Sequence, residues 1–124
     1  RKGILGGVLI RGQLHHGWTS YPLPLTDLSH IDWKPPQPPV SQPAFFRAEF
    51  EVDQPADTFL RLPGWEKGVV WVNGFNLGRY WKRGPQHTLY IPGPLLRPGL
   101  NVLILFEQHH PGQARIELLD HPVY

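Results

Sequence analysis

Proline and glycine punctuate this chain along its whole length, and they constrain its fold more than any other feature. Fifteen prolines and thirteen glycines are spread through 124 residues. Because a proline costs about 3 kcal/mol in the interior of a helix, no segment between them favours a long helix. The apolar runs that remain are short and rich in valine, isoleucine, leucine and aromatic residues. Such runs, bounded by turn residues, predict an all-β protein.

The composition indicates a globular chain with one core. Hydrophobic residues make up 40% of the sequence and charged residues only 18%. The net charge is +2, and the basic residues are scattered except for Arg79, Lys82 and Arg83, so no nucleic-acid partner is expected. The absence of cysteine excludes disulfides and thiolate metal sites. No run reaches the ~18 apolar residues of a membrane-spanning helix, so no membrane span is expected.

The strand pattern is clearest between residues 44 and 124. Phe46, Ala48 and Phe50 alternate with charged residues, which predicts a strand over residues 44–52 with one apolar face. Asn73-Gly74 lies between two apolar runs and predicts a type I′ hairpin turn. Five consecutive apolar residues at 102–106 favour a central strand, although a short buried helix has the same pattern. Further strands are expected at 58–62, 69–72, 88–91 and 114–119, with a helical turn and a tight turn over 93–99.

Six or more antiparallel strands in this length imply two packed sheets, an antiparallel β-sandwich of the jelly-roll type. Before it, residues 4–10 predict a strand that Gly6 and Gly7 weaken. The proline-rich stretch at 34–39 favours polyproline II. We therefore divide the chain into an N-terminal strand and extended segment (1–27), a proline-rich linker (28–43) and the sandwich (44–124). Because the whole chain contains no Met, we expect it to be part of a longer protein.

One long motif carries a resemblance. Residues 57–81 read DTFLRLPGWEKGVVWVNGFNLGRYW, followed by GPQ at 84–86 and PLL at 94–96. This stretch resembles the C-terminal region of family 35 glycoside hydrolases, in particular the animal β-galactosidases and their β-galactosidase-like relatives. Weaker similarity extends over nearly the whole chain, and the proline-rich linker departs most. The resemblance implies a galactose-binding-like jelly roll, with residues 1 to about 14 belonging to the preceding β-domain.

The resemblance also implies a function for a parent protein. Such enzymes carry a catalytic (β/α)₈ barrel whose two glutamates hydrolyse terminal β-galactosides with retention. Those barrel positions have no counterpart here, so we expect no catalytic residue and no cofactor in this chain, while the parent is a retaining β-galactosidase-type enzyme. The expected partners are the barrel and the preceding β-domain of the parent chain, and galactosyl glycans remain an alternative partner. A secreted or lysosomal location is implied by the same resemblance.

The remaining polar residues point to no metal or catalytic site. Adjacent side chains on a strand face opposite ways, so His15-His16 and His109-His110 each offer at most one ligand to a site. No metal site is therefore expected. Glu49 and Glu51 are expected to point outward from their strand, and all ten carboxylates are expected to be structural or solvating.

The best candidates for ligand binding are aromatic, amide and guanidinium side chains that lie close together in the motif. Aromatic faces of this kind stack on sugar rings, but the same residues also fill cores and domain interfaces. Three functions stay open: a domain that supports the barrel, a galactoside-binding module, and a protein-interaction domain of an inactive relative. An exposed aromatic platform would favour the second, and a large exposed apolar surface would favour docking. The candidate ligand-binding residues are Trp65, Trp71, Asn76, Arg79, Tyr80 and Trp81.

Overall fold

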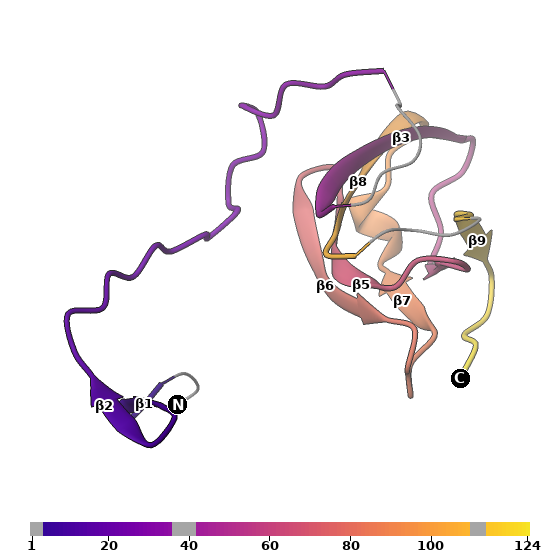
Figure 1. The fold of residues 1–124 in the computed structure, drawn as a ribbon. Coiled ribbons are helices and arrows are strands. Elements are labelled where there is room, and N and C mark those ends of the chain that lie inside the picture. Colours follow the sequence, from indigo (N-terminus) through magenta and orange to yellow (C-terminus); the bar gives the residue numbers. More distant parts are fainter. Residues whose placement is uncertain (1–3, 36–41, 110–113) are drawn as a thin grey trace.

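The structure is a computed structural model that describes residues 4–35, 42–109 and 114–124 (Figure 1). Within these ranges it consists of nine strands and one short 3₁₀ turn, η1. The elements are β1 (Val8–Ile10), β2 (Gln13–His15), β3 (Ala44–Val52), β4 (Thr58–Arg61), β5 (Lys67–Val72), β6 (Phe75–Trp81), β7 (Thr88–Ile91), η1 (Gly93–Leu95), β8 (Gly99–Glu107) and β9 (Glu117–Leu119).

Seven of these strands form a sandwich of two antiparallel sheets. The larger sheet has the order β3-β8-β5-β6, and the smaller has the order β7-β4-β9. In the larger sheet β8 pairs with β3 on one side and with β5 on the other, so it is the central strand that the sequence predicts. Strand β6 pairs only with β5 and forms an edge of this sheet. The all-β, antiparallel, two-sheet architecture confirms the predicted fold class.

The core lies between the two sheets. Leu60 from β4 and Ile91 from β7 meet Val70, Leu103 and Leu105 from the larger sheet, and all five are buried almost completely. Burial of such aliphatic side chains is worth about 1.5–3 kcal/mol each and is the main force that holds the sheets together. Three partly buried residues of β3 complete this layer, as the predicted alternation requires: Phe46, Ala48 and Phe50.

The hairpin between β5 and β6 has the predicted turn. Asn73 and Gly74 both have positive φ, at 49° and 84°, as a type I′ turn needs. The 3₁₀ turn after β7 agrees with the helical turn expected there. The strands at 44–52 and 88–91 begin and end where the sequence predicts, whereas the last strand is shorter than expected and spans only Glu117–Leu119.

The first 35 residues depart most from the prediction. The expected strand at 4–10 is reduced to β1, which pairs with a strand that we did not predict, β2. The turn between them is two residues long, and its Arg11 and Gly12 take positive φ, which lets the chain reverse there. Figure 1 shows this hairpin at the end of an extended segment that leads away from the sandwich. The division into residues 1–27, 28–43 and 44–124 stays a prediction, and most of the proline-rich stretch (36–41) lies outside the described residues.

Candidate ligand-binding site

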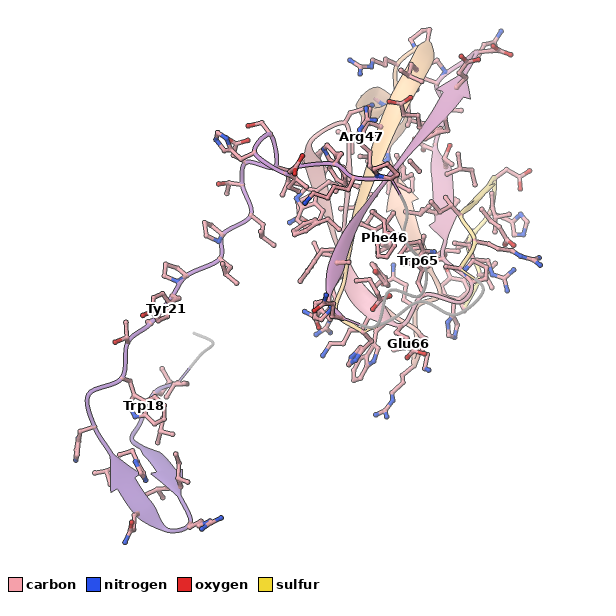
Figure 2. All side chains as sticks on the ribbon, turned by 45° about the horizontal axis from the view of Figure 1, so that its top comes forward. Trp18, Tyr21, Phe46, Arg47, Trp65 and Glu66 are labelled. Carbon is pink, nitrogen blue, oxygen red and sulfur yellow. The ribbon has the colours of Figure 1, made fainter. Side chains whose placement is uncertain are left out.

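The six candidate residues do not form one site. Trp65, in the loop before β5, and Trp71, in β5, are only 6% and 2% exposed. Trp65 belongs to the core between the sheets, where its ring meets Phe46 edge-on with centroids 5.0 Å apart. Figure 2 shows Phe46 and Trp65 lying together in the sandwich. Trp71 lies between the core residues Val70 and Val72 in sequence, so its side chain points to the outer face.

Four of the six candidates share a small cavity at the open edge of the sandwich, between β6 and β7. Its volume is about 50 Å³. It is lined by Trp65, Arg79, Tyr80 and Trp81, together with the loop residues Gln86 and His87. Trp71 and Asn76 do not line it. The structure therefore keeps four candidates together, assigns Trp71 to the outer sheet face, and leaves Asn76 exposed beside the β5–β6 turn, where its Oδ1 accepts a bond from the Gly78 amide.

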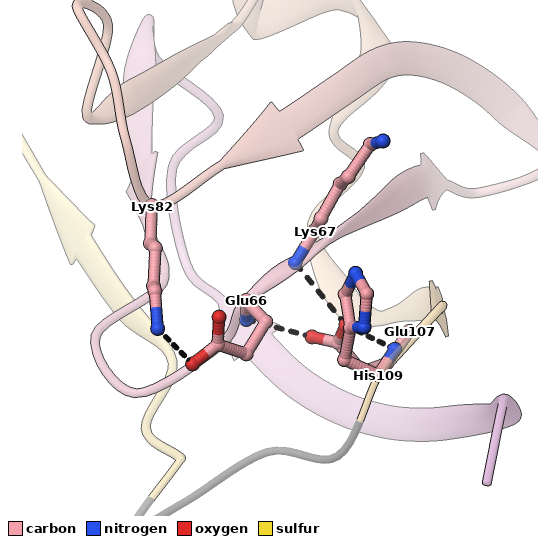
Figure 3. Close-up of polar contacts among 5 residues, drawn as sticks. All are labelled: Glu66, Lys67, Lys82, Glu107 and His109. Atoms are coloured by element: carbon pink, nitrogen blue, oxygen red, sulfur yellow. Dashed lines mark hydrogen bonds and ion pairs between the residues drawn. The ribbon is translucent and has the colours of Figure 1, made fainter.

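A buried carboxylate lies behind the cavity, in contact with the lining residue Tyr80. Glu107, at the end of β8, is 0% exposed. Its side chain accepts hydrogen bonds from the backbone amides of Glu66 (2.8 Å), Lys67 (3.1 Å) and His109 (3.0 Å), as Figure 3 shows. A buried charge is tolerated when charge-assisted hydrogen bonds of this kind replace its hydration. Glu107 therefore ties the loop before β5 to the end of β8.

Glu107 also accepts a bond from the hydroxyl of Tyr80, at 3.3 Å. Burial, and then the negative charge of Glu107, raise the pKa of Tyr80 above its ordinary value of 10.0. The tyrosine is consequently a neutral hydrogen-bond donor whose hydroxyl is engaged with Glu107 and with the carbonyl of Phe106. Sequence reasoning treated Glu107 as one of ten ordinary carboxylates, and only its position at the end of a buried apolar strand could have singled it out.

Trp81 is the one candidate aromatic side chain with a substantially exposed ring, at 37%. It lies on β6 directly opposite Lys67 of β5. Arg79 precedes it by two residues and therefore shares its face of the strand. These side chains are on the outer face of the larger sheet, so the exposed part of the site is cationic and aromatic.

The carboxylates nearest to the cavity are held in other contacts. Retaining glycosidases need two carboxyl groups about 5–5.5 Å apart. No carboxylate lines the described cavity. The nearby Glu66 forms an ion pair with Lys82 (Figure 3), and Glu107 is occupied by its four donors. What the site offers is hydrogen bonding, cationic charge and one accessible indole.

The described residues show neither a metal-binding cluster nor a membrane-spanning helix. Over residues 4–35, 42–109 and 114–124, no three histidine, aspartate or glutamate side chains converge as a metal site would require, and His110 of the second histidine pair is outside these ranges. No helix in the part of the chain that the structure describes is long and apolar enough to cross a membrane.

Comparison with known proteins agrees with the fold. The family model described as the galactose-binding domain of β-galactosidase matches residues 43–101. Beta-galactosidase-1-like protein 2 of Homo sapiens is 41% identical over 92% of this chain and 19% of its own length. Beta-galactosidase 17 of Arabidopsis thaliana is 38% identical over 97% of this chain and 20% of its own length. Beta-galactosidase of Macaca fascicularis is 34% identical over 98% of this chain and 22% of its own length.

These matches and the two antiparallel sheets define the class of protein as a galactose-binding-like β-sandwich. The chain spans about a fifth of the length of the curated relatives that it matches. It belongs to the family of β-galactosidases and β-galactosidase-like proteins, which confirms the resemblance carried by residues 57–81.

Proposed function

We propose that this chain is the non-catalytic C-terminal domain of a β-galactosidase-like glycoside hydrolase and that it supports the catalytic barrel of that parent. The parent is a β-galactosidase-type enzyme, as the relatives' names suggest. By the family resemblance, it hydrolyses terminal non-reducing β-D-galactosyl residues with retention. The chain's small share of those relatives and the absence of carboxylates from the described lining of its cavity support a role without catalysis. The partners are the barrel and the preceding β-domain of the same parent chain, and the location is secreted or lysosomal.

The observation that carries this proposal is the uncovered apolar surface of residues 4–23. Ile4, Leu5, Tyr21 and Leu23 are each 80% exposed or more. Figure 2 shows Tyr21, with Trp18, on the extended segment outside the sandwich. Each square ångström of such surface gains about 25 cal/mol when it is removed from water, so this segment is stabilised when another part of the parent covers it. Residues 1 to about 14 then complete the preceding β-domain.

A binding experiment with the separated parts tests the proposal. The 124-residue chain is mixed with the remaining part of the parent, and association is measured by calorimetry and by the melting temperature of the catalytic part. We expect association and a raised melting temperature. A Tyr21→Ser/Leu23→Ser variant should bind at least tenfold more weakly, because two large apolar contacts are lost.

Tyr124→Ser is the matched control, because Tyr124 is also exposed but lies at the other end of the chain. It should bind as the unmodified chain does. A chain that neither associates with the catalytic part nor raises its melting temperature would contradict the proposed support of the barrel.

The second candidate function is a galactoside-binding module. It is favoured by the description of the matching family model and by the accessible indole of Trp81 beside the cavity. It is disfavoured by the burial of Trp65 and Trp71, which removes two of the three candidate tryptophans from any stacking platform. A titration with galactose and lactose, followed by NMR at the tryptophan indole N–H signals, distinguishes the binding module from the supporting domain. Saturating shifts favour the module, and unshifted signals favour the supporting domain.

The third candidate, a protein-interaction domain of a relative with an inactive barrel, uses the same exposed surface. Its distinguishing measurement is hydrolysis of a β-galactoside by the whole parent protein. Activity favours the supporting domain, and an inactive parent that still binds this chain favours the interaction domain.

A further inference from the structure

Three cations surround the indole ring of Trp81. The Nζ atom of Lys67 lies 5.2 Å from the ring centroid, and the guanidinium carbons of Arg79 and Arg83 lie 5.8 Å and 5.6 Å from it. All are within the ~6 Å range of cation–π attraction. We call these four residues the Trp81 cation cluster.

The backbone explains why these side chains gather. Lys67 is the cross-strand partner of Trp81 in the β5–β6 ladder, so the two share the outer face of the sheet. Arg79 joins them because alternate residues of β6 face the same way. Arg83 is brought back by the turn after β6, in which the amide of Gly84 donates to the carbonyl of Trp81 at 3.0 Å. Two strands and a turn therefore place three positive charges around one ring.

The described residues supply no counter-charge to this cluster. The nearby lysine, Lys82, is paired with Glu66, and the other arginine ion pairs involve Arg47 and Arg61. No carboxylate of residues 4–35, 42–109 or 114–124 forms an ion pair with Lys67, Arg79 or Arg83. Since each cation is within about 6 Å of the same centroid, they lie within about 12 Å of one another, close to the Debye length of about 10 Å at 0.1 M salt. The indole attracts the cations but does not neutralise them.

The cavity beside the cluster limits what can bind. Arg79 and Trp81 form part of its wall, and Gln86 and His87 add polar groups. Its volume of about 50 Å³ accommodates a few water molecules. A substituent of a sugar ring fits such a space, whereas the ring itself would lie outside, against the exposed part of the Trp81 indole.

We propose that the Trp81 cation cluster binds a saccharide that carries an oxyanion, either a sulfate ester or a carboxylate. The oxyanion accepts charge-assisted hydrogen bonds from Arg79 and Arg83, whose planar guanidinium groups suit sulfate and carboxylate geometry. Lys67 completes the neutralisation, and the indole edge contacts the sugar ring. This site goes beyond support of the barrel, because it lies on β5 and β6 and not on the N-terminal segment, so its failure leaves the proposed function untouched.

A titration of the ¹⁵N-labelled 124-residue chain tests the site. The probes are galactose 6-sulfate, galacturonic acid, galactose and inorganic sulfate, and the readout is the indole N–H signal of Trp81, assigned with Trp81→Phe. We expect saturating shifts with at least one of the two charged sugars and binding at least tenfold weaker for galactose and for inorganic sulfate. The two charged sugars distinguish a sulfate ester from a carboxylate. Affinity should fall when salt rises from about 0.01 M to 0.15 M, which shortens the Debye length from about 30 Å to about 8 Å.

Matched variants connect binding to the cluster. Arg79→Gln should weaken binding of the charged sugar about tenfold, because one charge-assisted hydrogen bond is lost. Arg115→Gln removes the same charge from an exposed position outside the cluster, two residues before β9 of the smaller sheet, and should leave the affinity unchanged.

Four results would overturn the proposal. The first is no shift of the Trp81 signal with either charged sugar at tens of millimolar. The second is equal affinity of the Arg79→Gln and unmodified chains. The third is equal affinity for inorganic sulfate, which would leave an anion site without sugar recognition. The fourth is tighter binding of a polyglutamate peptide than of either charged sugar, which would assign the cluster to an acidic protein partner.

Discussion

Asn73 donates a hydrogen bond of 2.8 Å from its side-chain amide to Oδ1 of Asn101. Asn73 opens the β5–β6 turn, and Asn101 is 0% exposed in β8. Asn73 also donates to the carbonyl of Leu95 and accepts from the amide of Val102, and Asn101 donates to the carbonyl of Arg97. One polar network therefore fixes the hairpin turn, the 3₁₀ turn and the start of the central strand against one another.

Replacement of Asn101 should lower the free energy of unfolding, because it breaks that network. Asn101→Ala removes one of the two acceptors of the Asn73 side-chain amide, which keeps its bond to Leu95, and it removes the partner of both the amide and the carbonyl of Arg97. Each polar group left unsatisfied away from water costs about 1–3 kcal/mol. We expect the free energy of unfolding to fall by about 3 kcal/mol, measured by urea denaturation. Asn76→Ala, at an exposed position three residues after Asn73, should change it by less than about 0.5 kcal/mol. Equal effects of the two variants would show that the network contributes nothing.

Glu107 gives a second stability prediction. Glu107→Ala removes the acceptor of three backbone amides at a position that is 0% exposed, and hydrogen bonds to a charged group are worth about 1.5–3 kcal/mol each. We expect the variant to be unfolded or molten at 25 °C by near-ultraviolet circular dichroism. Glu49→Ala, on the exposed face of β3, should retain the native spectrum. A native-like melting curve for Glu107→Ala would contradict the role of the carboxylate as an anchor.

The raised pKa of Tyr80 predicts a loss of stability in alkali. Above pH 10 the unfolded chain releases the tyrosine proton while the folded chain retains it, so rising pH stabilises the unfolded state relative to the folded state. The contribution is fully present below pH 10 and declines above it, by at most about 1.4 kcal/mol per pH unit. Tyr80→Phe should therefore lose less stability between pH 9.5 and pH 11 than the unmodified chain, a difference that denaturation at several pH values detects. Tyr21→Phe, at an exposed position, is the control and should follow the unmodified chain. Parallel pH profiles for Tyr80→Phe and the unmodified chain would refute the assignment.

The inner face of β3 can be tested with a charge. Phe50 packs against the core cluster between the sheets, so Phe50→Asp would bury a carboxylate without a partner. We expect this variant to be unfolded, whereas Glu51→Asp on the neighbouring exposed position should melt as the unmodified chain does. A folded Phe50→Asp with unchanged thermal melting would mean that this strand face has been assigned wrongly.

Gly68 is required because two elements approach it closely. A Cβ atom there would overlap the carbonyl oxygen of Phe106 and lie 2.6 Å from the hydroxyl of Tyr80. Gly68→Ala should therefore lower the free energy of unfolding by about 3 kcal/mol or more. Gly6→Ala, where a Cβ atom meets nothing within 4 Å, should be nearly neutral. Thermal melting of the two variants is the measurement. Equal melting temperatures for Gly68→Ala and Gly6→Ala would show that β5 can shift to accommodate a Cβ atom at position 68.

Local features of the fold could be predicted because their causes are local. The alternation of β3, the Asn73-Gly74 turn and the 3₁₀ turn each depend on residues that are neighbours in the chain. The β1–β2 hairpin was missed because its residues carry no regular alternation, and its turn uses Arg11, a residue type that rarely takes positive φ.

The candidate site was predicted only in part. The sequence places Trp65, Trp71 and Trp81 within one motif, but a side chain's burial depends on which strand lies opposite it. Trp65 enters the core, Trp71 turns to the outer sheet face, and only Trp81 stays accessible. Two of the amides that bind Glu107, those of Glu66 and Lys67, lie 41 and 40 residues earlier in the chain, so no local pattern marks that carboxylate as buried.

By itself, the sequence determined an all-β chain of the β-galactosidase family, with most strands of the sandwich, its main turn and the apolar face of β3. Those features follow from backbone preferences and from side-chain alternation, which act between near neighbours. Only the tertiary structure decided the strand order β3-β8-β5-β6, the burial of Glu107 and the gathering of three cations around Trp81. The physical reason is that the pairing of segments distant in the sequence decides which hydrogen-bond partners and charges become neighbours. Local sequence patterns do not specify that pairing.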